Sequence, residues 1–218
     1  MKRAVICFTR VPKPGVTKTR LLPVLKPEQC AGLHWAFLRD LAEIYKKLDA
    51  HLFVAYTPDP DWESLKSVFP PAGYFPQKGQ DLGEKMYRVI RKVLDLDYES
   101  VILTGADLPL MTADHLESGF SVLEEKDIAI GPTPDGGYYL IGMKKPCRDI
   151  FRVEGYGGGN VLENTLAAAE SAGLSVGFAM GCSDVDTPGD LWDLTKTVDP
   201  DSHTGRYLNQ LRQEERRS

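Results

Sequence analysis

Short apolar runs alternate along the chain with longer stretches in which apolar residues recur every third or fourth position. The runs at 3–8, 51–56 and 100–104 have the length and composition of buried β-strands. Residues 27–48 show the clearest helical spacing, with one apolar face that contains Cys30, Leu33, Phe37, Leu41, Ile44 and Leu48. Strands joined by helices predict a mostly parallel sheet that is covered on both faces.

The second half of the chain departs from this simple alternation. Residues 127–131 and 138–143 bracket a Pro-Asp-Gly-Gly turn, which predicts a hairpin with antiparallel pairing. A last strand over 174–180 leads into a final core helix that begins near Pro188. We therefore predict an α/β protein, a three-layer α/β/α arrangement around a mostly parallel mixed sheet.

Length and composition predict one domain. The chain has 218 residues, of which 42% are hydrophobic and 26% charged, and no shift in composition marks an internal boundary. We expect a single domain over 1–198, followed by a peripheral tail over 199–218, a helix that frays at its end. No window approaches 18 consecutive apolar residues and the start lacks a long apolar segment, so we expect a cytoplasmic protein without a membrane span.

The charge is distributed unevenly. The net charge is −5 and the isoelectric point near 5.4, which argues against nucleic acid as a partner. Yet the first 27 residues carry seven Lys or Arg and no Asp or Glu. Four of these cations, Arg10, Lys13, Lys18 and Arg20, lie in a Pro- and Gly-containing loop after the first strand. A cationic loop at the carboxyl end of a buried strand predicts a phosphate site, although a solvated surface loop would have the same composition.

Several carboxylates are expected at the same edge of the sheet. Asp107 follows the strand at 100–104, Asp135 lies in the hairpin turn, and Asp184 and Asp186 follow the last strand. Mg²⁺, or Mn²⁺, bound by one or two carboxylates and by substrate phosphates would balance the nearby cations. We predict Asp107 and Asp186 as ligands, with Asp184 as the substitute for Asp186. Alternatively, Asp107 is an N-cap or turn residue. Thr187 or Asp186 can cap the helix at Pro188, and we expect one of the two aspartates to cap it and the other to point into the site.

Two further segments could contact a nucleotide. The pair Gly136 and Gly137 would let a substrate approach the backbone, or would serve only the turn. Gln77, Asp81 and Gly83 belong to a polar loop that enters a helix, where Asp81 is also a suitable N-cap. The four cysteines show no C-x-x-C spacing and the four histidines are scattered, so we expect no zinc site and no His-based triad.

In chain order, these segments resemble the nucleotide-diphospho-sugar transferase superfamily, which has a Rossmann-like, glycosyltransferase-A type of fold. Residues 105–110 resemble the segment that carries a metal-binding aspartate in its nucleotidyltransferases, and 184–191 the segment that supplies the second ligand. Residues 12–20 resemble the phosphate loop of the molybdenum-cofactor and phospholactate guanylyltransferases. The likeness is strongest to a small bacterial glycosyltransferase-like branch, through 81–85 and 134–140.

This resemblance implies a metal-dependent transferase with a nucleotide donor and a small acceptor. The favoured reaction is nucleotidyl transfer from a nucleoside triphosphate to a phosphorylated acceptor, with Lys18 and Arg20 as the catalytic phosphate clamp. A single acid at Asp107, in place of an Asp-x-Asp, favours this reaction. The first alternative is glycosyl transfer from a nucleotide-diphosphate sugar, for which Asp135 is the candidate base. The second is a non-catalytic nucleotide-binding module, which the low glycine content of the first loop leaves open.

Overall fold

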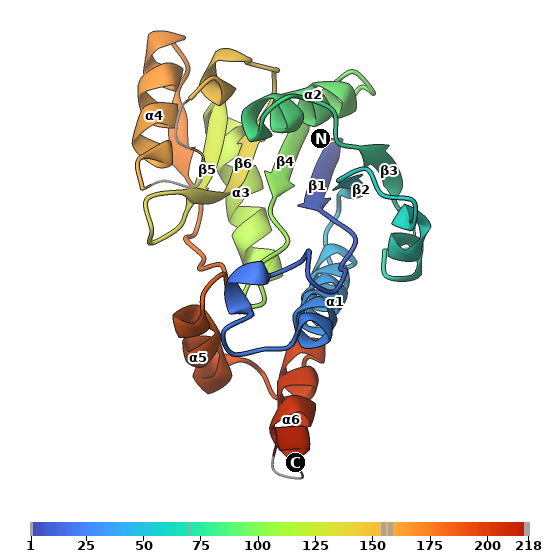
Figure 1. Cartoon of the computed structure of the whole chain (residues 1–218). Coiled ribbons are helices and arrows are strands. Elements are labelled where there is room, and N and C mark those ends of the chain that lie inside the picture. Colours follow the sequence, from blue (N-terminus) through green and yellow to red (C-terminus); the bar gives the residue numbers. More distant parts are fainter. Residues whose placement is uncertain (1, 70, 154–155, 157–158, 216–218) are drawn as a thin grey trace.

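A seven-stranded sheet forms the centre of the protein, in a computed structural model that describes residues 2–69, 71–153, 156 and 159–215 (Figure 1). The strand order is β3-β2-β1-β4-β6-β5-β7. The strands are β1 Arg3–Thr9, β2 His51–Tyr56, β3 Gly73–Pro76, β4 Ser100–Thr104, β5 Ile128–Pro132, β6 Tyr138–Met143 and β7 Val176–Phe178. Strand β6 is antiparallel to β4 and β5, and every other pairing is parallel, which confirms the predicted mixed sheet.

Helices cover both faces of this sheet. They are α1 Pro27–Tyr45, α2 Leu82–Leu94, α3 Ala113–Glu125, α4 Val161–Ser171, α5 Pro188–Thr197 and α6 His203–Glu215, with short 3-10 helices η1 Thr19–Leu21, η2 Trp62–Ser67 and η3 Asp149–Phe151. Alternate residues of β1 point to opposite faces: Val5 packs with α1 and α3, whereas Ile6 packs with α2 and α4. The three-layer prediction is confirmed. A possible N-cap followed by a proline, Asp59-Pro60, predicts a short helix that extends to Phe69, and the structure has the 3-10 helix η2 there.

A third apolar cluster lies outside the two sheet faces and joins distant parts of the chain. Leu21 and Leu33 meet Val185 of the loop before α5 and Leu208 and Leu211 of α6. The carboxylate of Asp40 on α1 accepts hydrogen bonds from the first backbone N–H groups of α6. In the segment after residue 199, where we expected a peripheral helix, α6 packs on α1. Residues 216–218, at the end that we expected to fray, lie outside the described part, and the boundary at 198 stays a prediction.

The strand order decides where functional loops meet. The chain moves from β1 outward to β2 and β3, then returns to β4 on the other side of β1. The loops that follow β1 and β4 therefore leave the same edge at a switch point, where open α/β sheets bind ligands. The backbone N–H of Val185 donates to the carbonyl of Asp107 at 3.0 Å and brings the loop before α5 to this edge. Among the helices of the described residues, none is both long and apolar enough to cross a membrane.

Candidate active site

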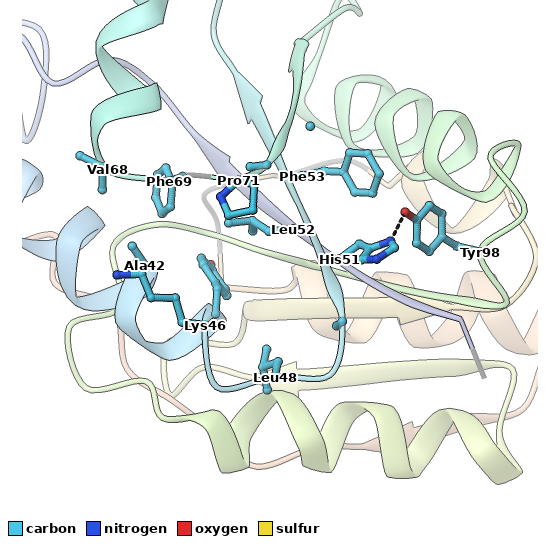
Figure 2. Close-up of a pocket in the computed structure, with 14 residues that line it drawn as sticks. Ala42, Lys46, Leu48, His51, Leu52, Phe53, Val68, Phe69, Pro71 and Tyr98 are labelled. Atoms are coloured by element: carbon cyan, nitrogen blue, oxygen red, sulfur yellow. Dashed lines mark hydrogen bonds between the residues drawn. The ribbon is translucent and has the colours of Figure 1, made fainter.

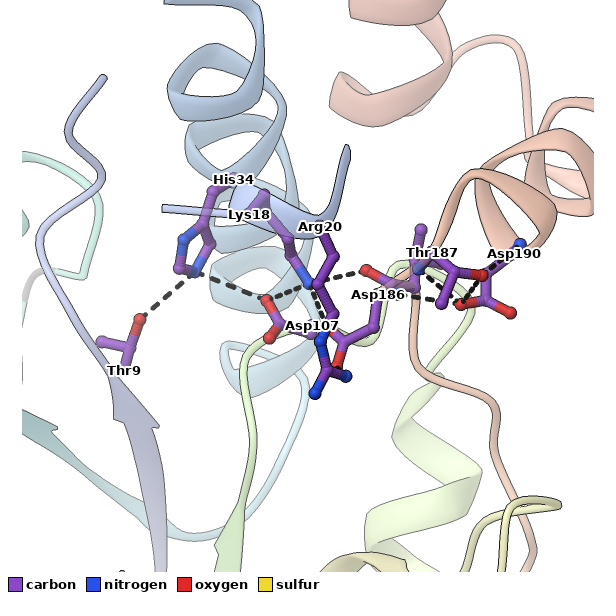
Figure 3. A network of polar contacts seen from close by, with 9 residues as sticks. Thr9, Lys18, Arg20, His34, Asp107, Asp186, Thr187 and Asp190 are labelled. Carbon is purple, nitrogen blue, oxygen red and sulfur yellow. Dashed lines mark hydrogen bonds and ion pairs between the residues drawn. The ribbon is translucent and has the colours of Figure 1, made fainter. Parts of the chain in front are cut away.

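The ammonium group of Lys18 lies between two carboxylates that are far apart in the sequence (Figure 3). Lys18 Nζ is 2.7 Å from Asp107 Oδ1 and 3.0 Å from Asp186 Oδ1. It also donates to the carbonyl oxygen of Val185 at 2.6 Å. The Lys18 side chain is only 3% exposed, whereas the two carboxylates are 39% and 38% exposed. The loop after β1, the loop after β4 and the loop before α5 therefore meet at one buried cation.

The local fold of the first loop places this lysine. Residue 18 has a left-handed backbone, with φ 54° and ψ 40°, immediately before η1. Thr17 is buried and its hydroxyl accepts from the backbone N–H of Lys13 at 3.0 Å, which closes the preceding turn. Leu21 is fully buried in the third apolar cluster and fixes the other end. A left-handed conformation costs a lysine roughly 1–2 kcal/mol, and such strain is concentrated at functional positions.

A buried histidine lies behind Asp107. His34 of α1 has Nε2 at 3.4 Å from Thr9 Oγ1 and 3.8 Å from Asp107 Oδ1. Burial lowers the pKa of His34 to about 4, so that the imidazole is neutral near pH 7. For Asp107, burial raises the pKa, but the positive charges of Lys18 and Arg10 outweigh that effect and leave the pKa below its ordinary value. Asp107 is therefore an ionised group at the carboxyl end of β4.

His34 is a site neighbour that the sequence reasoning missed. The signal was present, because His34 falls among the buried, apolar positions of α1, between Leu33 and Phe37. A polar ring in an apolar stripe indicates a buried partner, yet the spacing alone does not say that the partner is Asp107. The partner is 73 positions away in sequence and is brought near by the parallel pairing of β1 with β4.

The hydrogen bonds at the start of α5 show which acids cap the helix and which face the site. Thr187 is the N-cap, and its hydroxyl accepts from the backbone N–H of Asp190. The Asp190 carboxylate in turn accepts from the backbone N–H groups of Asp186 and Thr187 at 3.1 and 2.7 Å. Neither Asp184 nor Asp186 caps the helix. The Asp186 side chain instead meets Lys18 and, at 3.4 Å, Arg20.

Two hollows adjoin these acids. The larger one, of about 290 Å³, is lined by four carboxylates, one arginine and an apolar wall that includes Leu82, Met86 and three tyrosines. Its charged residues are Arg20, Asp107, Asp135, Asp184 and Asp186. The smaller hollow, of about 220 Å³, is polar and lined by Arg10, Lys18, Arg20 and His34 together with Asp107 and Asp186. Arg20, Asp107 and Asp186 therefore lie between the two hollows.

The donor set of the larger hollow fits a divalent cation that is shared with a substrate. Burial raises the pKa of Asp184, and the neighbouring carboxylates of Asp186 and Asp135 raise it further, so negative charge is crowded there. Within the described residues, no three His, Cys, Asp or Glu side chains come close enough to hold an ion alone. Mg²⁺ commonly binds one or two carboxylates and completes its octahedron with water and phosphate oxygens. Asp107 and Asp186 remain our predicted ligands.

The hairpin turn contributes its backbone to the larger hollow. Gly137 lines the hollow, as does Asp135, whose Oδ1 accepts from the Thr133 hydroxyl and from the Gly137 N–H at 3.1 Å. Gly136 has φ +85°, and a Cβ there would lie 2.0 Å from the carbonyl oxygen of Gly159. The turn therefore needs glycine at 136 for its own conformation and packing, apart from any substrate contact.

Four of the predicted nucleotide-binding residues have other partners in the structure. Lys13 pairs with Asp59 and Asp61, each at 2.7 Å, and lines neither hollow. The Gln77 side chain is buried and its amide donates to the carbonyls of Thr9 and Ala55. The remaining two, Asp81 and Gly83, belong to the start of α2.

Asp81 and Gly83 serve the local structure of α2. Asp81 is the N-cap of this helix and accepts from the N–H of Glu84 at 2.7 Å. Gly83 is buried, and a Cβ at this position would lie 2.1 Å from the carbonyl of Phe151. Both residues lie outside the lining of the two hollows, although Leu82 between them lines the larger one.

Comparisons with known proteins show which protein families this chain resembles. Residues 40–157 match the family described as uncharacterized protein conserved in bacteria, DUF2064. A 2-phospho-L-lactate guanylyltransferase from Methanocaldococcus infernus is 27% identical over 194 residues, which span 89% of this chain and 85% of the relative. A crystal structure from Desulfovibrio desulfuricans G20, provisionally described as a nucleotide-diphospho-sugar transferase, is 33% identical with a TM-score of 0.89, over 96% of this chain and 95% of that one.

A more distant structure shares the fold alone. The manganese complex of Rv0371c from Mycobacterium tuberculosis H37Rv is 15% identical to this chain, with a TM-score of 0.52. The alignment covers 91% of this chain and all of the other.

Proposed function

Since the chain belongs to the DUF2064 family and to the nucleotide-diphospho-sugar transferase superfamily, we propose that it is a metal-dependent nucleotidyltransferase. Its donor would be a nucleoside triphosphate and its acceptor a small phosphorylated molecule. The observation that carries the proposal is the meeting of Asp107 and Asp186 with Arg20 at the switch point of the sheet, beside a hollow of about 290 Å³. The guanylyltransferase relative favours GTP as the first donor to test.

Nucleotidyl transfer mainly requires that the protein orient the reactants and neutralise the charge of the phosphates. An oxygen of the acceptor phosphate attacks the α-phosphorus of the triphosphate, the bond to the bridging oxygen breaks, and pyrophosphate leaves. Because the attacking oxygen is already anionic, no strong protein base is needed, and the protein acts by orienting the reactants and neutralising charge. Asp107 and Asp186 would hold Mg²⁺ or Mn²⁺, which supplies positive charge at the phosphate oxygens.

The arginines are suited to the phosphates themselves. Arg20 is 68% exposed and lines both hollows, so its guanidinium can turn toward a bound phosphate at small cost. Arg10 lines the smaller hollow beside it. A guanidinium can bind a phosphate through two parallel hydrogen bonds, which adds direction to charge neutralisation. We propose these two arginines as the phosphate-binding groups.

Glycosyl transfer has less support from the geometry. That reaction needs a carboxylate to take a proton from the acceptor hydroxyl. Asp135, the candidate base, lines the hollow, but its Oδ1 is engaged by Thr133 and Gly137. Nucleotidyl transfer at this site is therefore our conclusion.

A nucleoside triphosphate as donor also makes the cytoplasm the expected place of action.

Ligand-induced stabilisation tests the proposal directly. The four nucleoside triphosphates and a set of nucleotide-sugars would each be added with and without Mg²⁺, and the melting temperature recorded. A ligand at 100 times its dissociation constant adds about 2.7 kcal/mol of stability, which is readily detected. We expect Mg²⁺-dependent stabilisation by a triphosphate, GTP first, followed by pyrophosphate release when phosphorylated acceptors are added. A preference for nucleotide-sugars would support glycosyl transfer, and binding without turnover would support the non-catalytic module.

A further inference from the structure

The Lys18 ammonium group is already surrounded by protein oxygens: it donates hydrogen bonds to Asp186 and to the Val185 carbonyl, and it forms an ion pair with Asp107. An ammonium has three N–H donors and no acceptor. Lys18 Nζ has three oxygens within 3.0 Å, on Asp107, Asp186 and Val185. A phosphate oxygen would have to compete with these three oxygens for the ammonium group. This differs from the role in the phosphate clamp that the sequence predicts for Lys18.

The surroundings of Lys18 also keep its charge inside the protein. The side chain is 3% exposed, and its ammonium lies 5.6 Å from the ring centroid of Phe37, within the range of a cation–π contact. Arg20, two residues on, is 68% exposed. A buried ammonium must be paired, whereas an exposed guanidinium remains available to a ligand. The two cations of the same short segment therefore have different surroundings and different uses.

The two acids need this cation. Asp107 Oδ1 and Asp186 Oδ1 both lie within 3.0 Å of the same nitrogen, so the two carboxylates are close neighbours at the switch point. Two carboxylates that share a site repel each other, and a cation between them removes the repulsion. Lys18 contacts one oxygen of each acid. It lines only the smaller hollow, while Asp107 and Asp186 also line the larger one.

We infer that Lys18 is a positioning residue, the internal counter-ion that holds Asp107 and Asp186 together, and that it is not a phosphate ligand. It acts through the two acids, whose other sides face the larger hollow. The left-handed backbone at residue 18 and the bond to the Val185 carbonyl fix the ammonium in this place. The role of the acids rests on the proposed function, but the ion pairing itself does not.

A charge-balanced double variant tests the inference in the absence of metal. The Lys18→Met variant leaves the two acids without their cation, and the Lys18→Met/Asp186→Asn variant returns the group to its original total charge. Each is compared with the unchanged protein in EDTA, by thermal melting and by calorimetric titration with inorganic tripolyphosphate. Lys46→Met is the matched control, since Lys46 is exposed and, within the part of the chain that the structure describes, forms its ion pair with Glu43.

We expect the single variant to melt lower and to bind tripolyphosphate about tenfold or more weakly, because two uncompensated carboxylates face the anion. The double variant should recover most of both losses, to within about threefold of the original affinity. Lys46→Met should change neither quantity. Recovery of binding separates this role from a merely structural one, which would restore melting alone.

The opposite results are equally clear. If Lys18 bound phosphate directly, the double variant would bind tripolyphosphate as weakly as the single variant, and the inference would be wrong. Failure of both variants to fold would also contradict it, since balancing the charge should restore folding. If the unchanged protein did not bind tripolyphosphate at all, the proposed phosphate site would fail, while the melting temperatures would still decide whether Lys18 serves the two acids.

Discussion

The two ends of the sheet carry hollows of opposite character. At the amino end of β2, a hollow of about 580 Å³ is lined mainly by apolar residues of α1, β2 and the segment before β3 (Figure 2). In this hollow, the polar side chains of His51 and Tyr98 form a hydrogen bond with each other. At the carboxyl ends of the strands, a hollow half that size is lined by four carboxylates and Arg20. Convergence of charge from distant segments, and not volume, identifies the site.

This comparison predicts the largest effect for Asp107. The Asp107→Asn variant keeps the size of the side chain but removes the charge at the carboxyl end of β4. We expect turnover to fall by about a thousandfold, or roughly 4 kcal/mol of transition-state stabilisation. The fold should persist, because Lys18 keeps Asp186 and Val185 as partners. Initial rates of pyrophosphate release at saturating Mn²⁺ measure this, and a rate within tenfold of the original would remove Asp107 from the catalytic machinery.

A smaller effect is expected at Arg20. The Arg20→Met variant removes an exposed guanidinium whose contact with Asp186 is long, at 3.4 Å. Exposed ion pairs contribute about 0–1 kcal/mol, so the melting temperature should hardly change. Loss of a phosphate contact should weaken tripolyphosphate binding about tenfold. Calorimetric titration measures the affinity, and an unaltered dissociation constant would show that Arg20 is not a phosphate-binding group.

Lys13 should matter much less, although it belongs to the same cationic loop. Its ammonium is already paired with Asp59 and Asp61. The Lys13→Met variant should change tripolyphosphate affinity by less than about threefold, an indirect effect of one screened charge. The same titration checks it. A loss as large as that of the Arg20 variant would mean that Lys13 leaves its acidic partners and reaches the ligand.

The smallest effect is expected in the apolar hollow of about 580 Å³ at the amino end of β2. Ala72 lines it, and the Ala72→Leu variant adds apolar volume without charge. We expect a change in stability within about 0.5 kcal/mol and turnover within twofold of the original. Denaturant unfolding and initial rates measure the two quantities. A marked loss of turnover would show that this end of the sheet takes part in the reaction and that the comparison of the two hollows is mistaken.

The fold could be predicted largely from local patterns. Buried strands at 3–8 and 100–104 and the hairpin around residues 134–137 are signalled by their own residues. The expected helix after Asp59 became the short η2, because local capping signals do not distinguish an α-helix from a 3-10 helix. The packing of α6 on α1 depends on Asp40, 163 residues before His203, and no local pattern contains that pairing.

The candidate site, too, could be predicted only in part from the sequence. The switch-point rule brought Asp107, Asp186 and the loop of Lys18 to one edge, because strand ends follow from strand positions. It could not tell which cations of the loop are used internally. Lys13 and Lys18 are both lysines of the same cationic loop, so the sequence does not distinguish them. In the structure, Lys13 pairs with surface acids, whereas Lys18 is buried between the site acids. Likewise, the sequence suggested that the Gln77 amide could bind a nucleotide, whereas in the structure this amide donates hydrogen bonds to the backbone of two strands.

The central claim is that the carboxylates of residues 107 and 186 hold a divalent ion beside a bound triphosphate. Crystals grown with Mn²⁺ and a non-hydrolysable GTP analogue would test it through the anomalous scattering of manganese. The account predicts a manganese peak in contact with Asp107 and Asp186 and with a phosphate oxygen of the analogue, while Lys18 stays between the two acids. A peak bound elsewhere, or a triphosphate bound away from these carboxylates, would contradict it.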